Sequence, residues 1–225
     1  MSFFELLLQS MPMFLKGMQL TLQLSLVSLI IAMFIGMISC LMNISKIRVL
    51  HWVSQSYINI IRGTPLLVQA FFIYFGVTKF FGFSMTALVA GTVALSLNAG
   101  GYLSEIFRGG IQAVPVGQME AARSLGMSKF RAMLRIILPQ AVRIVIPSVT
   151  NQCCITIKDT SIISVIGLAE LTMMGSQIIA RTYRSFEIWI CVGILYFIVI
   201  YGFSKLAKLV EKRLSLAKDT DKKPA

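Results

Sequence analysis

Long apolar runs constrain the fold of this chain more than any other feature of its sequence. Residues 17–42, 85–107 and 186–209 are dominated by Leu, Ile, Val, Ala, Met and Phe, without the polar stripe of a helix on a soluble core. A helix needs roughly 20 such residues to cross the hydrocarbon core of a bilayer. The sequence therefore predicts an all-α, polytopic membrane protein.

The composition supports a membrane protein and argues against a soluble nucleic-acid-binding one. Hydrophobic residues make up 56% of the chain and charged residues only 13%, whereas soluble domains are about 25% charged. The net charge of +12 would suggest a nucleic-acid partner in a soluble protein, but no zinc-finger spacing or aromatic-interleaved basic patch accompanies it. In a membrane protein, an excess of Lys and Arg indicates retention on the cytoplasmic side.

The apolar runs divide into about five expected spans. Their approximate bounds are Gly17–Met42, Ser54–Gly76, Met85–Phe107, Ile137–Ile157 and Phe186–Leu209. Pro65 removes a backbone donor inside the second span and predicts a kink there, and Arg62 beside it is expected to be interfacial or paired. Residues 160–185 hold an apolar piece too short to cross, so a re-entrant or interfacial segment is favoured over a sixth span.

The distribution of Lys and Arg predicts the orientation. If the N-terminus lies outside, fifteen of the 21 Lys and Arg residues fall in inside regions and five in outside regions, with Arg62 left to the second span. We therefore expect the N-terminus outside and the C-terminus in the cytoplasm. The expected organisation is an external segment at 1–16, a transmembrane domain at 17–210 with a cytoplasmic loop at 108–137, and a cytoplasmic tail at 211–225.

The loop between the third and fourth spans is charged and partly amphipathic. A helix is predicted to begin near Pro115 with Glu120 in its first turn, where a carboxylate is favoured by the helix dipole. Gly126 permits a sharp turn, and Ser128 can cap the helix that follows. The residues alone leave two interpretations open: a loop lying on lipid headgroups, or a surface that docks a cytoplasmic partner.

The spacing in this loop resembles a known signature. Glu120-Ala121-Ala122 is followed by Gly126, Ile136 and Leu138-Pro139, which is similar to the EAA motif of the membrane subunits of ATP-driven ABC importers. RGTPLLVQAFFIYFG, YLSEIFRGGIQAVPVGQ and KDTSIISVIGLAEL resemble the permeases for polar amino acids. One departure is NAGGYLSEI, in which Gly100 or Gly101 is an extra glycine.

The resemblance implies the partners and the role of the loop. The loop would hold a coupling helix that docks into a separate ATP-hydrolysing subunit, through Glu120, Ala121, Ala122, Arg123, Gly126 and Lys129. It also implies a second permease subunit (identical or closely related), an extracytoplasmic solute-binding protein and a place in the bacterial cytoplasmic membrane. The chain has no G-x-x-x-x-G-K-[ST] phosphate loop, so we expect a transport subunit rather than an enzyme, with no catalytic residues.

Polar residues within or beside the spans are the candidates for the substrate pathway. They are Asn98, Asp159, Thr160 and Ser161, expected to meet the ammonium and carboxylate of the substrate, and Thr64 and Gln69 along the pathway. A charge at mid-membrane is costly and needs a reason. Alternatives remain open: Asn98 can form an interhelical hydrogen bond, Asp159 can pair with Lys158, and Glu105, on the face of Asn98, can pair with Arg108.

A metal- or cofactor-containing protein and a secondary transporter or channel both fit the sequence less well. The four cysteines lie in apolar runs and His51 is the only histidine, so neither a metal centre nor another cofactor is expected. The remaining alternative is a secondary transporter or channel for a small polar solute. Such a protein should show inverted repeats or a chain of intramembrane carboxylates, and neither is visible.

Overall fold

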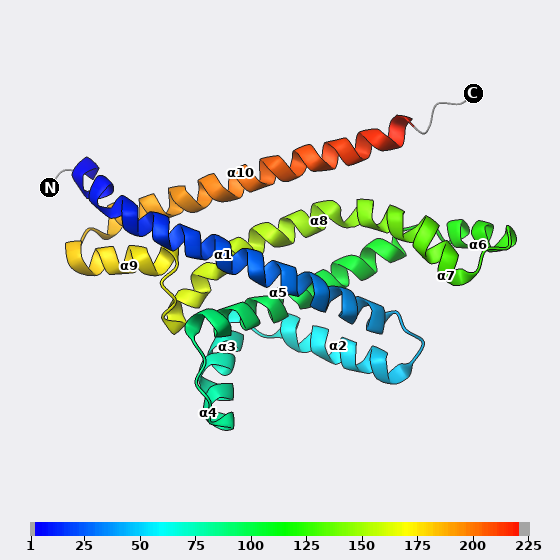
Figure 1. The fold of residues 1–225 in the computed structure, drawn as a ribbon, viewed down its shortest axis with the longest axis horizontal. Coiled ribbons are helices and arrows are strands. Elements are labelled where there is room, and N and C mark those ends of the chain that lie inside the picture. The colour runs from blue at the N-terminus through cyan, green and yellow to red at the C-terminus, as the bar shows by residue number, and fades with distance from the viewer. Residues whose placement is uncertain (1–2, 221–225) are drawn as a thin grey trace.

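The computed structural model describes the backbone of residues 3–220 and the side chains of residues 5–209. Every regular element in that range is helical (Figure 1), which confirms the all-α prediction. The α-helices are α1 (Phe3–Asn43), α2 (Arg48–Gly63), α3 (Leu66–Phe71), α4 (Thr78–Phe81), α5 (Ala87–Gln112), α6 (Val116–Ser124), α7 (Lys129–Ala132), α8 (Leu138–Asp159), α9 (Leu171–Thr182) and α10 (Ser185–Thr220). π-helical turns η1 (Phe72–Val77) and η2 (Met133–Ile137) and the 3₁₀ segment η3 (Thr160–Ile166) join some of them.

The described residues contain four helical stretches long and apolar enough to cross a membrane, and a fifth if a bent pair is counted as one span. The four are Glu5–Asn43, Ala87–Gln112, Lys129–Ile166 and Ser185–Leu209. The fifth consists of Arg48–Gly63 and Leu66–Phe81, which meet at 108°. This confirms the expected number of about five spans.

The second expected span is broken rather than merely kinked. α2 stops at Gly63, and Thr64 and Pro65 both have extended backbone, at φ −124°, ψ 142° and φ −64°, ψ 140°. Proline disfavours helical backbone at the residue before it, so Thr64 cannot continue α2. The chain therefore turns through 108° before α3 begins, and α3 and α4 point away from the long axis (Figure 1).

The ends of the other elements differ from their expected positions. α1 begins at Phe3, so most of the predicted external segment 1–16 is part of a helix that continues into the first span. α10 extends to Thr220 and thus covers most of the predicted tail, of which residues 221–225 lie outside the described part of the chain. α9 has 12 residues and is about 18 Å long, too short to be a sixth span across a core of about 30 Å.

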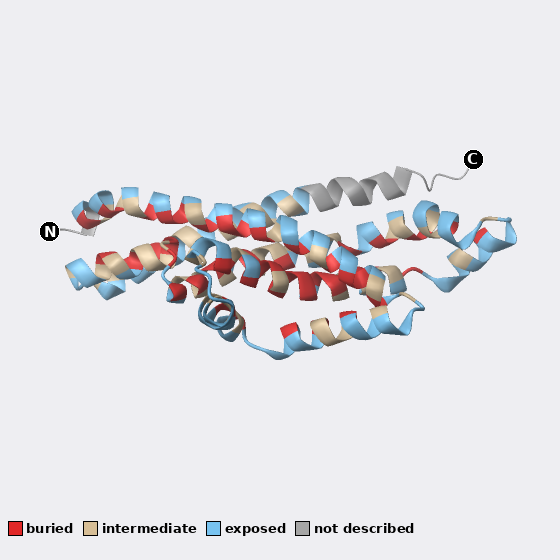
Figure 2. Cartoon of the chain, turned by 60° about the horizontal axis from the view of Figure 1, so that its bottom comes forward, coloured by how far each residue is buried: buried red, intermediate tan, exposed pale blue. Residues whose placement is uncertain are grey.

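α5 lies at the centre of the bundle and packs against α1, α2 and α8. Figure 2 shows that α5 has the most continuous run of buried residues among the long helices. Small residues permit this close approach: a Cβ added at Gly100 would lie 2.8 Å from Ile35 Cγ2, and one at Gly101 2.8 Å from Ile61 Cγ2. Close backbone approach through small residues is the usual basis of helix association in membranes, where no hydrophobic force brings helices together.

A buried carboxylate fixes the segment before α9. Glu170 is fully buried, and its Oε1 accepts a hydrogen bond from the backbone N–H of Met173 at 2.9 Å. Its Oε2 accepts from the hydroxyl of Tyr196 in α10 at 2.8 Å and from that of Thr21 in α1 at 3.5 Å. Glu170 therefore caps α9 and joins it to both neighbouring helices, which holds α9 at the opposite end of the bundle from α6 and α7 (Figure 1).

Neighbouring glycines in α5 offer a direct test of this packing. A Cβ at Gly110 would overlap the side chain of Val145 in α8, whereas a Cβ at Gly109 meets no atom within 4 Å. Gly110→Ala should therefore destabilise the protein by about 1–3 kcal/mol through overpacking. Gly109→Ala should be neutral or stabilising by up to about 1 kcal/mol. Thermal unfolding of the two purified variants measures the difference, and equal melting temperatures would contradict the packing described.

Candidate functional site

A cleft of about 520 Å³ opens beside the break between α2 and α3. The break, α5 and α8 supply its walls, which are lined by Arg62, Gly63, Thr64, Pro65, Leu66, Asn98, Tyr102, Gln152, Ile155 and Asp159. Three residues predicted for the pathway thus meet there: Thr64 from the break, Asn98 from α5 and Asp159 from the end of α8. A membrane-embedded cleft lined by amides, hydroxyls and charges of both signs is suited to a small polar solute.

Gln69 connects the walls of the cleft by hydrogen bonds. Its Nε2 donates to the carbonyl oxygens of Ile61 at 2.9 Å and Thr64 at 3.1 Å, and to Thr64 Oγ1 at 2.9 Å. The Ile61 carbonyl has lost its helical donor at the break, because Pro65 has no N–H, and the Thr64 carbonyl lies in the extended backbone between the two helices. The Oε1 of Gln69 accepts a hydrogen bond from Asn98 Nδ2 at 3.0 Å. Gln69 therefore stabilises the break and orients the Asn98 amide, and the predicted interhelical hydrogen bond of Asn98 is present.

Arg62 supplies the positive charge of the cleft. Its Nη1 lies 3.6 Å from Glu105 Oε2, and its guanidinium lies 5.6 Å from the ring centroid of Tyr102. Glu105 is held more tightly by Arg108, whose Nε and Nη2 donate to the two carboxylate oxygens at 2.9 Å and 2.7 Å. The predicted Glu105–Arg108 pair is therefore present, and Arg62 keeps part of its hydrogen-bonding capacity for a ligand.

Of the three predicted pathway residues Asp159, Thr160 and Ser161, only Asp159 lines the cleft. No ion pair joins Asp159 to Lys158 in the described residues, and its carboxylate lines the cleft. Thr160 is fully buried and donates to the carbonyl of Ile157 at 2.8 Å. Ser161 donates to the carbonyl of Lys158 at 2.7 Å. The structure thus places neither hydroxyl in the cleft, because the chain continues past Asp159 as a tight 3₁₀ segment whose first two hydroxyls donate back to the last turn of α8.

Three polar or charged cleft residues were not among the sequence candidates. Arg62 was expected only to be interfacial or paired, and Tyr102 and Gln152 were given no role. Gln152 lies two turns before Asp159 on α8, and Tyr102 lies one turn after Asn98 on α5. A search one or two helical turns from Asn98 and Asp159, along the same helix face, would have found both residues. Arg62 could have been found from its position three residues before Pro65 in an expected span, because a charge in a span is costly and needs a functional reason.

The loop between α5 and α8 forms a helix–turn–helix. Gly126 has φ +82°, a left-handed conformation that suits glycine and ends α6. The Ser128 hydroxyl accepts from the backbone N–H of Arg131 at 3.3 Å and caps α7, as predicted. One detail of the prediction is wrong: α6 begins at Val116, so Glu120 lies in its second turn and gains less from the helix dipole than a residue in the first.

The outer surface of this loop combines charge with exposed apolar side chains. Glu120, Arg123 and Lys129 are exposed, and the side chains of Val116, Leu125 and Phe130 are 72%, 84% and 73% exposed. The inner surface is fixed instead, because Ala122 is only 2% exposed and Val114, Ile137 and Ala141 pack together beneath the loop. A rigid, protruding apolar surface ringed by charges has the composition of a protein-docking site.

Comparison with known proteins places this chain among transport proteins. The family model described as "Binding-protein-dependent transport system inner membrane component" matches residues 30–216. The nopaline transport system permease of Agrobacterium fabrum is 39% identical over 216 residues, which cover 92% of this chain and 90% of that protein. The arginine transport system permease of Bacillus subtilis is 36% identical and covers 94% and 96%. The glutamine transport system permease of Escherichia coli is 35% identical and covers 92% and 95%.

Solved structures agree with these sequence matches. A crystal structure of an amino acid ABC transporter with histidines superposes with a TM-score of 0.90 at 42% identity, covering 95% of this chain and 99% of that chain. An inward-facing methionine ABC transporter superposes with a TM-score of 0.78 at 19% identity, covering 91% and 97%. The second likeness concerns the fold alone.

The role of Gln69 can be tested by stability. Gln69→Leu leaves the carbonyls of Ile61 and Thr64 without this donor, and because Ile61 is buried, the loss of its hydrogen-bond partner costs about 1–3 kcal/mol. The variant should melt at a lower temperature than the parent. Gln23→Leu is the matched control, since Gln23 is exposed on α1 and should melt like the parent or slightly higher. If Gln69→Leu were as stable as Gln23→Leu, Gln69 would not hold the break together.

Proposed function

The chain belongs to the family of binding-protein-dependent transport system inner membrane components, as a membrane-spanning permease of an amino acid ABC importer, and from this premise we propose how it carries a polar amino acid. The substrate crosses through the cleft beside the α2–α3 break. Its transport is driven by a separate ATP-hydrolysing subunit that docks on the α6–α7 loop. The observation that carries the proposal is the meeting of Arg62, Asn98 and Asp159 in one cleft.

The charges of the cleft complement a zwitterion. The Arg62 guanidinium can pair with the α-carboxylate of an amino acid in a bidentate manner, and the Asp159 carboxylate can accept hydrogen bonds from its ammonium group. Thr64, Asn98 and Gln152 add neutral donors and acceptors. Asp159 is also suited to a basic side chain of the substrate. The names of the relatives for nopaline, arginine and glutamine transport support a polar amino acid as the substrate class.

The loop and the cleft lie on one continuous helical stretch. Residues from Lys129 to Ile166 form a single apolar helical stretch of 38 residues, which is about 57 Å long. Lys129 begins this stretch at the docking loop, and Asp159 lies near its other end. A displacement of the loop is therefore passed to the cleft wall through α8. Changing a two-state balance from 1:99 to 99:1 requires about 5.5 kcal/mol of differential binding, which ATP supplies through the docked subunit.

The orientation and the remaining partners follow from the same proposal. The α1–α2 connection and the α6–α7 loop lie at one end of the bundle, and α9 lies at the other (Figure 1). The docking end carries Lys46, Arg48 and the loop cations, so it faces the cytoplasm. The N-terminus is then outside, where a solute-binding protein delivers the amino acid. A second permease subunit, identical or closely related, completes the assembly, and the location is the bacterial cytoplasmic membrane.

The substrate assignment is tested by variants of the cleft. The permease is co-purified with its ATPase subunit, and ATP hydrolysis is measured with individual amino acids and their binding protein. Asp159→Asn should reduce stimulation by the preferred amino acid at least tenfold, because a charge-assisted hydrogen bond contributes about 1.5–3 kcal/mol. Ser161→Ala lies outside the cleft and should behave like the parent. Equal stimulation of the two variants would contradict binding in this cleft.

Docking of the ATPase subunit is tested by variants of the loop. Gly126→Leu forces a side chain into left-handed backbone at a cost of about 1–2 kcal/mol and should weaken assembly about 5–30-fold. Glu120→Ala removes an exposed charge from α6 and should weaken assembly and uptake as well. Gly202→Leu on α10 is the control, because a side chain there meets open space. If Gly126→Leu and Glu120→Ala both assembled and transported like this control, the loop would not be the docking site.

A further inference from the structure

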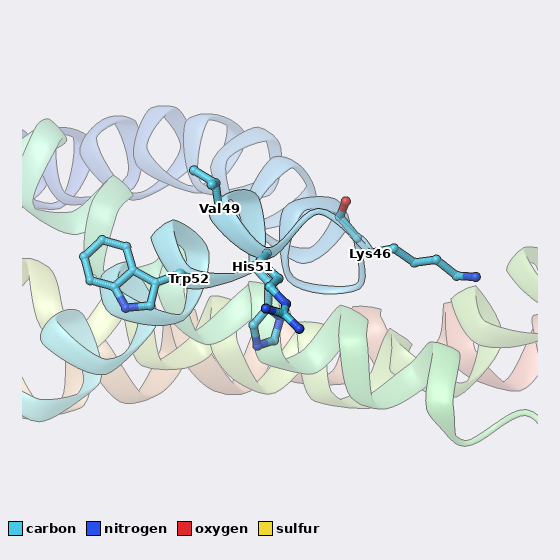
Figure 3. Close-up of a pocket in the computed structure, with 6 residues that line it drawn as sticks. Lys46, Val49, His51 and Trp52 are labelled. Atoms are coloured by element: carbon cyan, nitrogen blue, oxygen red, sulfur yellow. The ribbon is translucent and has the colours of Figure 1, made fainter.

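A second hollow lies at the turn between α1 and α2, outside the substrate cleft and the docking loop. Its volume is about 500 Å³, and it is lined by Ser45, Lys46, Arg48, Val49, His51 and Trp52. Figure 3 shows Lys46 extending from the connecting loop, while Val49, His51 and Trp52 project from the first turns of α2. Neither the proposed transport step nor ATPase docking uses these residues.

The charged groups of this hollow are of one sign. Lys46 and Arg48 are exposed, and neither takes part in the ion pairs of the described residues. No acidic residue lines the hollow. The His51 ring is held in place, since its Nδ1 donates to the carbonyl oxygen of Asn43 at 2.7 Å. The hollow therefore offers two cations beside a fixed imidazole wall, an arrangement that attracts an anion.

Apart from Ser45, the rest of the hollow is apolar and faces outward. Val49 and Trp52 are 69% and 70% exposed, and Val53 in the next turn is 45% exposed. A tryptophan with this exposure at the end of a membrane helix belongs in the interface, where its ring lies at headgroup level. Neighbouring cations and exposed apolar groups together match a ligand whose anionic head continues into hydrocarbon. A soluble anion would leave the apolar half of the hollow uncovered.

The hollow is built in advance of any ligand. Ser39 and Ser54 hydroxyls lie 2.9 Å apart, and Ser54 Oγ also donates to the carbonyl of Ser39 at 2.7 Å. Asn43 Nδ2 donates to Gln55 Oε1 at 3.0 Å. These contacts clamp the end of α1 to the start of α2 immediately behind the hollow. Binding there needs little ordering of the backbone, which reduces its entropic cost.

We propose that this hollow binds an anionic phospholipid of the leaflet that borders the docking end of the bundle. Lys46 and Arg48 pair with the lipid phosphate, and Val49 and Trp52 pack on the upper part of an acyl chain. The site rests on the placement of this end at the membrane surface and not on the identity of the substrate. Each Lys or Arg beside an anionic membrane surface strengthens binding about fivefold, so the two cations together select anionic over zwitterionic lipid by at least tenfold.

The test uses tryptophan fluorescence of the full-length chain. The chain contains two tryptophans, so Trp189→Phe leaves Trp52 as the only reporter. The protein is reconstituted in phosphatidylcholine vesicles that contain a small, equal fraction of either phosphatidylglycerol or phosphatidylcholine brominated on its acyl chains. Brominated phosphatidylglycerol should quench Trp52 severalfold more strongly. Unbrominated phosphatidylglycerol should relieve this quenching, whereas soluble glycerol phosphate, which lacks acyl chains, should not.

Charge-matched variants decide whether the hollow causes the difference in Trp52 quenching between the two brominated lipids. Lys46→Gln combined with Arg48→Gln should abolish the difference between the two brominated lipids. Lys205→Gln combined with Lys208→Gln removes the same charge from exposed positions of α10 and should preserve it. Equal quenching by both lipids in the parent overturns the proposal without any variant. It is also overturned if the Lys46 and Arg48 variant keeps the difference, if the Lys205 and Lys208 variant loses it, or if glycerol phosphate relieves the quenching.

Discussion

The close approach of α5 to its neighbours is the contact on which the rest of the structure depends. Water is absent from the bilayer core, so hydrophobic burial does not bring spans together there, and packing and hydrogen bonds must do so. Gly100 and Gly101 let α5 approach α1 and α2, and Gly110 lets it approach α8. The glycine pair that contains the extra glycine, Gly100 or Gly101, relative to the permeases that the sequence resembles lies at this contact. Glycine is required at both positions for a structural reason, since a Cβ at either one would press on an isoleucine of the facing helix.

This packing creates the cleft and connects it to the docking loop. α5 presents Asn98 and Glu105 toward the broken α2–α3 pair, where Gln69 donates to the Ile61 carbonyl that Pro65 leaves without a helical donor and accepts from Asn98. α8 closes the cleft with Asp159 and runs back to the loop without interruption. Because packed helices shift between discrete arrangements rather than deform gradually, a displaced loop reaches the cleft as movement of a whole helix.

The features that depend on local chemistry could be predicted from the sequence. The spans follow from their length and hydropathy, and the turn at Gly126 and the cap at Ser128 follow from the conformational preferences of glycine and serine. The Glu105–Arg108 pair follows from helical spacing. The resemblance of the loop and of three further segments identified the family, and the match to residues 30–216 confirms it.

The features that depend on the relative placement of distant segments could not be predicted. Pro65 indicated a disturbance, but whether a proline kinks a helix or breaks it depends on partners such as Gln69 that satisfy the freed carbonyls. Thr160 and Ser161 follow Asp159 directly, yet the 3₁₀ turn directs their hydroxyls to the backbone. Glu170 has no sequence neighbour that reveals its partners, Thr21 and Tyr196, because these lie 149 and 26 residues away.

The central claim is that a separate ATP-hydrolysing subunit drives this permease through the α6–α7 loop. The most direct measurement is uptake of a radiolabelled amino acid into vesicles that hold the permease, its ATPase subunit and an external binding protein. Accumulation should require ATP on the side of the docking loop and should be absent when only a proton or sodium gradient is imposed. Accumulation driven by an ion gradient without the ATPase subunit would contradict the claim and identify a secondary transporter.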